Sequence, residues 1–134
     1  MHEQILIVDY GSQFTQLIAR RIRDLNIYCE IHPFNNLPEI TDSVKGIVLS
    51  GSPASTTQPD APVADLDIMN MSVPILAVCY GAQYLVSSNG GKVEKSTHRE
   101  YGRANLSVSQ HSPLLNGISD GSQVWMSHGD TILE

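Results

Sequence analysis

The chain alternates short apolar runs with segments of helical periodicity. Residues 5–8, 46–49 and 75–78 are runs of mostly branched apolar side chains, which are typical of strands buried on both faces of a sheet. Residues 27–31 form a further run, which Pro33 closes. Each run ends in polar, glycine or proline residues that favour turns. The pattern therefore predicts four strands.

Two segments between these runs have the period of helices. The first follows residues 5–8, with Ser12 as its expected N-cap. Its apolar positions recur at helical spacing at Phe14, Leu17, Ile18, Ile22 and Leu25. The second covers residues 81–88 and ends at the Asn-Gly-Gly of residues 89–91. A further helix is expected at residues 62–71.

The order of these elements is that of an α/β fold. It predicts a flavodoxin-like, doubly wound, mostly parallel sheet with helices on both faces. Beyond Gly91 the elements shorten, and strands are expected at residues 92–94, 104–108 and 123–125. Doubly wound folds place their chemistry at the carboxyl ends of the strands. Those ends carry Asp9-Tyr10-Gly11, Ser50-Gly51-Ser52 and Cys79-Tyr80-Gly81.

Length and charge narrow the classes of function. The 134 residues carry 8 Lys and Arg against 14 Asp and Glu, a net charge of −6, so we expect no nucleic-acid partner. We expect one soluble, cytoplasmic domain over residues 1–134, because no apolar stretch reaches the roughly 20 residues of a membrane span and the N-terminus lacks the basic region of a secretory signal. The two cysteines form no C-x-x-C pair, so neither a disulfide scaffold nor a metal site is expected.

Cys79 is the first candidate for chemistry. It directly follows a buried strand and precedes a helix, which is the pattern of a nucleophile elbow. Ala77 and Gly81 flank it with the small side chains that a tight turn needs, and the N-terminus of a helix favours a thiolate. The alternative is a cysteine packed in the core, the more common place for an isolated Cys. That is the role we expect for Cys29, which lacks the elbow context.

Three other features near the expected strand ends each have two interpretations. Gln83 lies one helical turn after Cys79 and either binds a polar substrate or faces solvent. The small residues 50–55 either present backbone N–H groups to an oxyanion or form a surface turn. His128 is either a catalytic base or a loop residue lining a pocket, and spacing alone does not decide between them.

Three segments resemble the class I, or triad-type, glutamine amidotransferases. The first is the opening strand and helix, with Ile-Leu-Ile-Val-Asp-Tyr-Gly-Ser-Gln at residues 5–13 and Thr-Gln-Leu-Ile-Ala-Arg-Arg at residues 15–21. The second is the elbow at residues 74–83. The third joins the Arg-Glu-Tyr-Gly of residues 99–102 with the Trp-Met-Ser-His-Gly-Asp of residues 125–130. The resemblance spans nearly the whole chain.

The resemblance implies a reaction and a set of site residues. Cys79 would attack the side-chain amide of glutamine, giving a glutamyl thioester and ammonia. The backbone N–H groups of Ser52 and Tyr80 would form the oxyanion hole. The residues that help to bind glutamine would be Gly51, Gln83, Ser127, Gly129 and Asp130. Ser52 and Ala77 stand where the family commonly has glycine, and both keep a small side chain.

The resemblance also implies partners. Ammonia would pass to a separate synthetase domain or subunit that uses ATP and Mg²⁺ to aminate XMP, the complete enzyme would be a homodimer, and this chain would hold no cofactor of its own. The family's catalytic His and Glu, in a His-Pro-Glu segment, have no counterpart before Glu134, so we expect a domain incomplete at its C-terminus. In that case His128 belongs to the glutamine pocket.

Two alternatives to this function differ in class. One is a non-catalytic module that keeps the fold and binds or regulates a synthetase partner. The other is a different elbow-type cysteine hydrolase whose base lies within this chain, with His128 as the candidate.

Overall fold

The computed structural model describes residues 2–56, 58–64, 66–67 and 70–133. These residues form two compact units, the first made of Met1–Glu94 with Ile132–Glu134 and the second of Lys95–Thr131. The single domain expected over residues 1–134 stays a prediction. Within the described part of the chain, no helix is long and apolar enough to cross a membrane.

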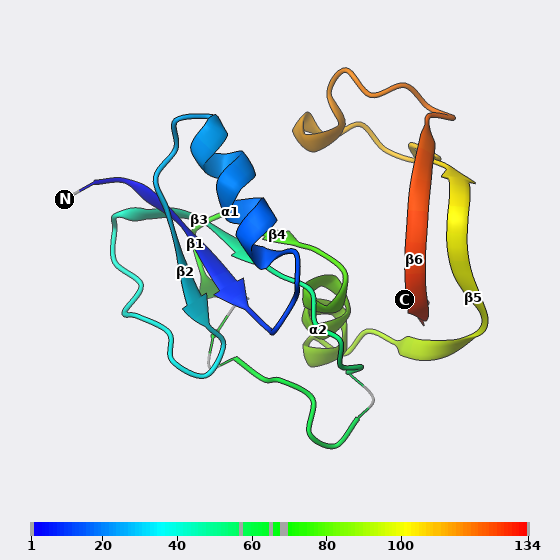
Figure 1. The fold of residues 1–134 in the computed structure, drawn as a ribbon, viewed down its shortest axis with the longest axis horizontal. Helices are drawn as coiled ribbons and strands as arrows, with labels where there is room; N and C mark the ends of the chain where they lie inside the picture. The colour runs from blue at the N-terminus through cyan, green and yellow to red at the C-terminus, as the bar shows by residue number, and fades with distance from the viewer. Residues whose placement is uncertain (1, 57, 65, 68–69, 134) are drawn as a thin grey trace. The chain divides into compact units, whose positions relative to one another are not determined.

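A parallel sheet of four strands forms the centre of the first unit (Figure 1). Its strands are β1 (Gln4–Asp9), β2 (Cys29–Pro33), β3 (Val44–Leu49) and β4 (Ile75–Ala77). Their order across the sheet is β2-β1-β3-β4, and all pairs are parallel. The chain therefore winds outward in both directions from β1 and β3, which places the topological switch point at the carboxyl ends of these two strands.

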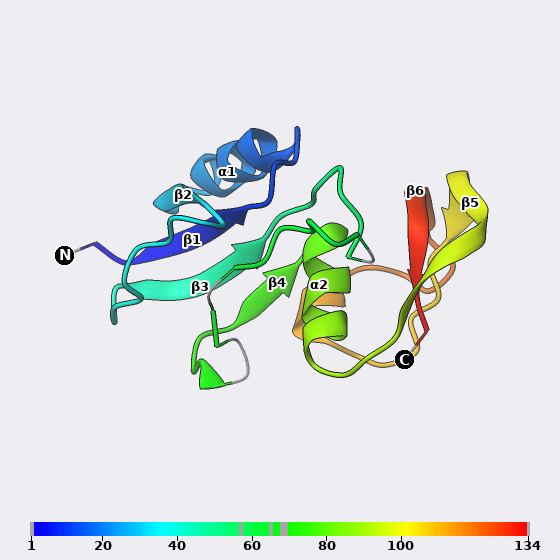
Figure 2. The ribbon, with the colours of Figure 1, turned by 90° about the horizontal axis from the view of Figure 1, so that it is seen from below.

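Helices cover both faces of this sheet, as the sequence predicts (Figure 2). On one face, Leu6 and Leu49 pack with Tyr80 of α2 (Tyr80–Ser88). On the other face, Ile7 and Val48 pack with Ala19 of α1 (Thr15–Asp24). The residues from β1 and β3 are almost completely buried, because successive side chains of a central strand point into two different cores.

The start of α1 differs from the expectation. The helix begins at Thr15, and Ser12 is not its N-cap. Instead, the Asp9 carboxylate at the end of β1 accepts hydrogen bonds from the Thr15 hydroxyl (3.1 Å) and the Gly11 N–H (2.8 Å). The Ser12 hydroxyl oxygen accepts one from the Phe14 N–H (3.0 Å). Side chains of the strand–helix turn therefore fix where the helix starts.

The buried face of α1 is also narrower than expected. Thr15 and Ala19 are buried, whereas Phe14, Leu17 and Leu25 are exposed. With 3.6 residues per turn, the stripe that faces the sheet follows Thr15, Ile18, Ala19 and Ile22. The three exposed side chains lie on its flank, where no other described element covers them.

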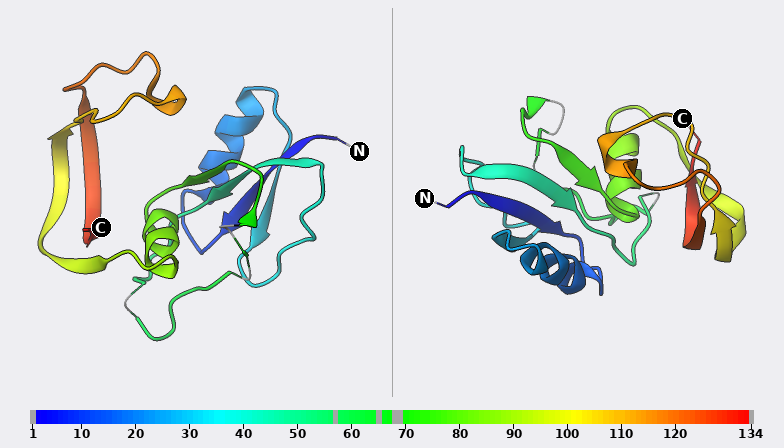
Figure 3. Two further views of the ribbon diagram at one scale, coloured as in Figure 1. Left: turned by 180° about the vertical axis from the view of Figure 1, so that it is seen from behind. Right: turned by 90° about the horizontal axis from the view of Figure 1, so that it is seen from above.

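The described residues of 62–71 form no α-helix, and among them Asn70 alone has 3₁₀ conformation, so the helix expected there is not found in the part that the structure describes. Positions 65, 68 and 69 lie outside the described residues. The segment belongs to the long connection between β3 and β4, which passes α2 (Figure 3). The hydroxyl of Tyr80 donates to the carbonyl of Pro62 (2.6 Å), and that of Tyr84 donates to the carbonyl of Ala64 (3.1 Å). In an α-helix, each of these carbonyls would accept a hydrogen bond from the N–H four residues later in the chain. Here they accept hydrogen bonds from tyrosine hydroxyls of α2 instead.

The second half of the chain has longer strands than expected. Strands β5 (Val93–Asn105) and β6 (Gln123–Ile132) pair in a separate two-stranded sheet, and the short 3₁₀ helix η2 (Pro113–Leu115) lies between them in sequence. Residues 93–94 and 104–105 of the expected strands at 92–94 and 104–108 are parts of β5, whereas residues 106–108 lie outside any strand. Along residues 123–128 exposed and partly buried side chains alternate, which is the period of a strand. The polar residues 127–130, expected in a loop, therefore lie within β6.

Candidate active site

Cys79 occupies a sharp turn between β4 and α2, as the elbow pattern predicts. Its backbone has φ 51° and ψ −116°, a conformation that is rare for a residue with a side chain. The side chain is exposed. Because α2 begins at the next residue, Cys79 lies at the N-terminal end of a helix. A strained backbone that holds an exposed thiol at a helix start is the geometry of a nucleophile elbow.

Gly81 lets this elbow approach the sheet closely. A Cβ at this position would lie 2.6 Å from the carbonyl oxygen and 2.7 Å from the Cβ of Leu49, distances that no side chain tolerates. The Gly81 N–H donates to the carbonyls of Ser50 and Val78, both at 3.0 Å. The first turn of α2 is therefore held directly against the end of β3, and this contact sets the position of Cys79.

We expect Gly81→Ala to lower the free energy of unfolding by about 2 kcal/mol. Alanine gains up to about 1 kcal/mol over glycine in a helix, but overpacking against groups that cannot move costs about 1–3 kcal/mol or more. Here the opposing atoms are the backbone of Leu49. Denaturant unfolding measures the change. Gly51→Ala is the matched control, because its Cβ meets other atoms only at 3.5 Å; equal stability of the two variants would contradict the close approach.

Ser50 joins the ends of β1 and β3. Its side chain is fully buried. The hydroxyl oxygen accepts a hydrogen bond from the Tyr10 N–H, and the O–H donates to the Gly51 carbonyl, both at 3.1 Å. Its own N–H donates to the Val8 carbonyl at 3.1 Å. This role was not predicted from the sequence. A hydroxyl residue placed directly after a buried strand is the only signal that the sequence offers for it.

The proposed oxyanion donors lie at the carboxyl ends of β3 and β4. Among the residues that the structure describes, no acceptor faces the backbone N–H of Ser52 or of Tyr80. The Ser52 hydroxyl oxygen accepts the Ala54 N–H at 3.1 Å, which holds the loop in a tight turn. Two N–H groups without acceptors suit an oxyanion. Their function stays a prediction.

The ends of β1, β3 and β4 converge at Gly51. A Cβ placed on Gly51 would lie 3.5 Å from the Cβ of Cys79 and 3.5 Å from the hydroxyl oxygen of Ser12. Three segments distant in sequence therefore meet around one backbone position. Gln83, partly buried, follows on α2, where its N–H donates to the Cys79 carbonyl at 3.1 Å. Ser12 is the member of this group that the sequence pattern did not indicate as a site residue.

An aromatic cluster packs next to the elbow. The ring of Tyr10 lies 5.3 Å from that of Tyr80, 5.7 Å from that of Tyr84 and 5.9 Å from that of Phe34. Burial, followed by the neighbouring tyrosines, raises the pKa of Tyr10 far above its usual range, and burial followed by Tyr84 raises the pKa of Tyr80. These phenols stay protonated near neutral pH. Their rings pack next to the elbow.

The remaining predicted residues lie in the second unit. Ser127, His128, Gly129 and Asp130 are all part of β6. The Nδ1–H of His128 donates to the carbonyl of Asp130 at 2.9 Å. That these residues share one glutamine pocket with Cys79 stays a prediction.

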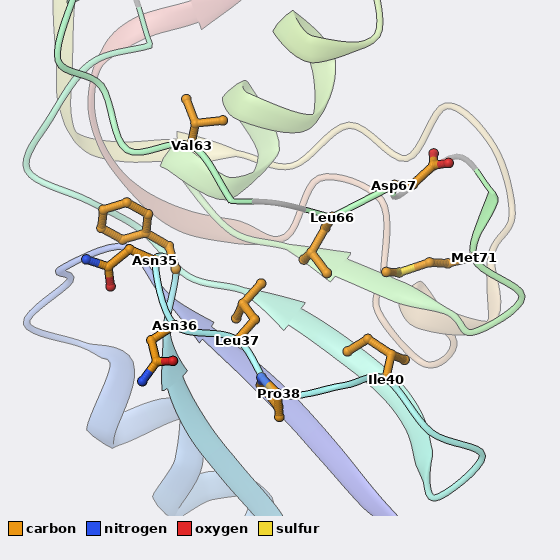
Figure 4. A pocket seen from close by; sticks show the side chains of 10 residues that line it. Asn35, Asn36, Leu37, Pro38, Ile40, Val63, Leu66, Asp67 and Met71 are labelled. Atoms are coloured by element: carbon orange, nitrogen blue, oxygen red, sulfur yellow. The ribbon is translucent and has the colours of Figure 1, made fainter.

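Two grooves lie away from Cys79. One of about 510 Å³ lies between residues 34–40 and the group Val63, Leu66, Asp67 and Met71, with Leu37 among the side chains that line it (Figure 4). Another of about 670 Å³ lies where residues 40–45 face residues 70–74, near the amino ends of β3 and β4. Neither includes a residue of the three converging strand ends. No group of three or more His, Cys, Asp and Glu side chains within the described ranges is placed to hold a metal ion.

Cys79 is expected to react with an electrophilic glutamine analogue much faster than Cys29. Cys79 is exposed, whereas Cys29 is 1% exposed and its thiol donates to the Ala19 carbonyl at 3.5 Å. Only a thiol that solvent can reach reacts without local unfolding. Brief labelling followed by peptide mapping measures the ratio. Equal labelling of both cysteines in folded protein would remove the elbow interpretation.

The fold and the elbow define the class of this protein. A flavodoxin-like sheet with an exposed cysteine between a strand and a helix is typical of α/β proteins with a nucleophilic cysteine. The family model for class I glutamine amidotransferases matches residues 6–134. The chain belongs to this family, which confirms the resemblance found in the sequence.

Curated relatives agree with this family. The chain is 56% identical to a GMP synthase [glutamine-hydrolyzing] of Cytophaga hutchinsonii over 135 residues, which is 100% of the chain and 26% of that protein. It is equally identical to one of Christiangramia forsetii over 134 residues, again 26% of the relative. The chain thus spans about a quarter of the length of these relatives.

Two solved structures share the fold. A provisionally assigned GMP synthase subunit of Thermoplasma acidophilum superposes with a TM-score of 0.79 at 30% identity, covering 99% of this chain and 68% of that one. A glutamine amidotransferase of Thermotoga maritima superposes with a TM-score of 0.77 at 18% identity, covering 98% and 63%.

Proposed function

We propose that this chain is the glutamine-hydrolysing part of a GMP synthase. Cys79 attacks the side-chain amide of glutamine, and the ammonia released passes to a synthetase domain or subunit that uses ATP and Mg²⁺ to convert XMP to GMP. The observation that carries the proposal is the exposed Cys79 at a strained elbow, in a chain 56% identical to relatives named GMP synthase.

The chemistry follows from the converging strand ends. The Cys79 thiolate adds to the amide carbon, and the oxygen that becomes negative accepts hydrogen bonds from the N–H groups of Ser52 and Tyr80. The C–N bond then breaks, ammonia leaves with an added proton, and water hydrolyses the thioester to glutamate. Glutamine is held by Gly51 and Gln83, with the β6 residues Ser127, Gly129 and Asp130.

The proton transfers require an acid–base group. The family resemblance implies a His and Glu in a His-Pro-Glu segment, which residues 1–134 do not contain. We place His128 in the glutamine pocket and do not assign this role to it. A cytoplasmic location fits two free cysteines, and the complete enzyme is proposed to be a homodimer, as the resemblance implies.

The test is GMP formation by the complete protein that carries this chain. We expect the complete protein to form GMP from XMP and ATP with either glutamine or added ammonia as the nitrogen source. Ammonia bypasses the glutaminase site, so the two assays separate this chain's reaction from that of the synthetase. Failure to use glutamine while ammonia is used would favour a non-catalytic module.

Gln83→Ala is expected to weaken glutamine use by about 10-fold and leave ammonia use intact. The side chain is placed one helical turn beyond Cys79, on the segment that forms the elbow. Losing one hydrogen bond to a substrate costs about 1–1.5 kcal/mol, which corresponds to about 10-fold. Steady-state kinetics with each nitrogen source measure the effect. If both activities fall together, Gln83 has a folding role instead.

A further inference from the structure

Ser12 faces the same open space as the nucleophile. It follows β1, whereas Cys79 follows β4, and Gly51 lies between them. A Cβ on Gly51 would be 3.5 Å from the Ser12 hydroxyl oxygen and 3.5 Å from the Cys79 Cβ. These two atoms are therefore separated by no more than twice that distance. Because residue 51 has no side chain, the position that its Cβ would take beside both atoms is left without a side-chain atom.

The Ser12 hydroxyl is held in place and still has bonding capacity. Its oxygen accepts the Phe14 N–H at 3.0 Å, which fixes the position of the oxygen. A hydroxyl has one donor and two lone pairs, so this contact leaves the O–H and one lone pair unused. Within the described residues no acceptor faces that O–H. The group is thus positioned by the backbone of the α1 turn to bind something else.

We propose that Ser12 contacts the substrate, and that its hydroxyl hydrogen-bonds the reacting carboxamide of glutamine in the gap between Ser12 and Cys79. The proposal rests on the proposed function, because it takes glutamine as the substrate. A carboxamide offers both an acceptor and donors, which match the O–H and lone pair that Ser12 has left. Gly51 serves the same contact by leaving room for the amide group.

The first test replaces Ser12 in the complete protein. Ser12→Ala is expected to lower kcat/KM for glutamine about 10-fold, the effect of losing one hydrogen bond. Ammonia-dependent GMP formation and the rate at which iodoacetamide alkylates Cys79 should not change. Ser12→Thr keeps the hydroxyl and should retain most of the glutamine activity.

The second test fills the gap from the other side. In Gly51→Ala the new methyl group meets its neighbours only at ordinary contact distance, so the unfolding midpoint should not change. The methyl group occupies part of the space between Ser12 and Cys79. We expect kcat/KM for glutamine to fall by more than the roughly 10-fold that one lost hydrogen bond costs, with ammonia-dependent activity intact.

The outcomes separate this proposal from the proposed function. If Cys79→Ser abolishes glutamine use but Ser12→Ala leaves its kinetics unchanged, Ser12 does not contact the substrate and only this proposal fails. If Ser12→Ala and Ser12→Thr both lower the unfolding midpoint and ammonia-dependent activity, Ser12 acts only at the start of α1, which also overturns it. If Cys79→Ser retains glutamine use, the proposed function itself fails.

Discussion

Replacing Cys79 by serine in the complete protein is expected to lower glutamine-dependent GMP formation by about 10⁴-fold or more. In the proposed function the Cys79 thiolate is the nucleophile, and removing the nucleophile from a catalytic unit costs about 10⁴–10⁶-fold. The elbow should keep its shape, because backbone hydrogen bonds around it do not involve the thiol. The Gly81 N–H donates to the carbonyls of Ser50 and Val78, and the Val78 N–H donates to the carbonyl of Leu49. Ammonia-dependent GMP formation should remain, since ammonia needs no nucleophile at this site.

Cys29→Ala is the matched control for this experiment. Cys29 is buried in the core cluster with Ile7, Ala19 and Val48. Its replacement should therefore lower the free energy of unfolding. The glutamine-dependent and ammonia-dependent activities of each folded molecule should not change. Paired assays with glutamine and with ammonia distinguish the two cysteines. Glutamine-dependent activity that survives Cys79→Ser would mean that the elbow does not carry the reaction.

The 134-residue chain on its own is expected to hydrolyse glutamine at least about 100-fold more slowly than the same chain extended through the family's His-Pro-Glu segment. A thiol must lose its proton before it attacks, and the departing ammonia must gain one. Positioned acid–base groups contribute about 10²–10⁴-fold to such steps, and triad members act as a unit. Ammonia release from the two chains, assayed in parallel, measures the difference.

Substantial turnover by the shorter chain would change the assignment of the base. His128 would then be the candidate, and His128→Ala should remove the activity. That result would also favour the alternative of a cysteine hydrolase with its base inside this chain. Turnover that appears only in the extended chain would leave His128 in its proposed place in the glutamine pocket.

Local patterns in the sequence were sufficient to predict the central strands β1 and β3 and the elbow at Cys79. The apolar runs that become β1 and β3 are buried on both faces, which leaves few alternatives to a central strand. The elbow is likewise local, because a strand, a tight turn and a helix start must follow one another directly around Cys79. The family resemblance depends on the same contiguous segments.

The start of α1 and the segment 62–71 were not predictable in this way. At the start of α1, the Asp9 carboxylate accepts a hydrogen bond from the Thr15 hydroxyl, and this side-chain contact determines where the helix begins. In the segment 62–71, tyrosine hydroxyls of α2 donate hydrogen bonds to the carbonyls of Pro62 and Ala64. A residue's helical propensity contains no information about partners that lie far along the chain, so tertiary contacts override it.

By itself, the sequence determined the α/β class, the parallel strands and the elbow position of Cys79, because each depends on neighbours within a few positions. Only the tertiary structure decided that Ser12, Gly51 and Cys79 surround one gap, and that Ser50 joins the end of β3 to Tyr10 after β1, 40 residues away. The physical reason is the parallel register of β1, β3 and β4, which brings their carboxyl ends together at one edge of the sheet.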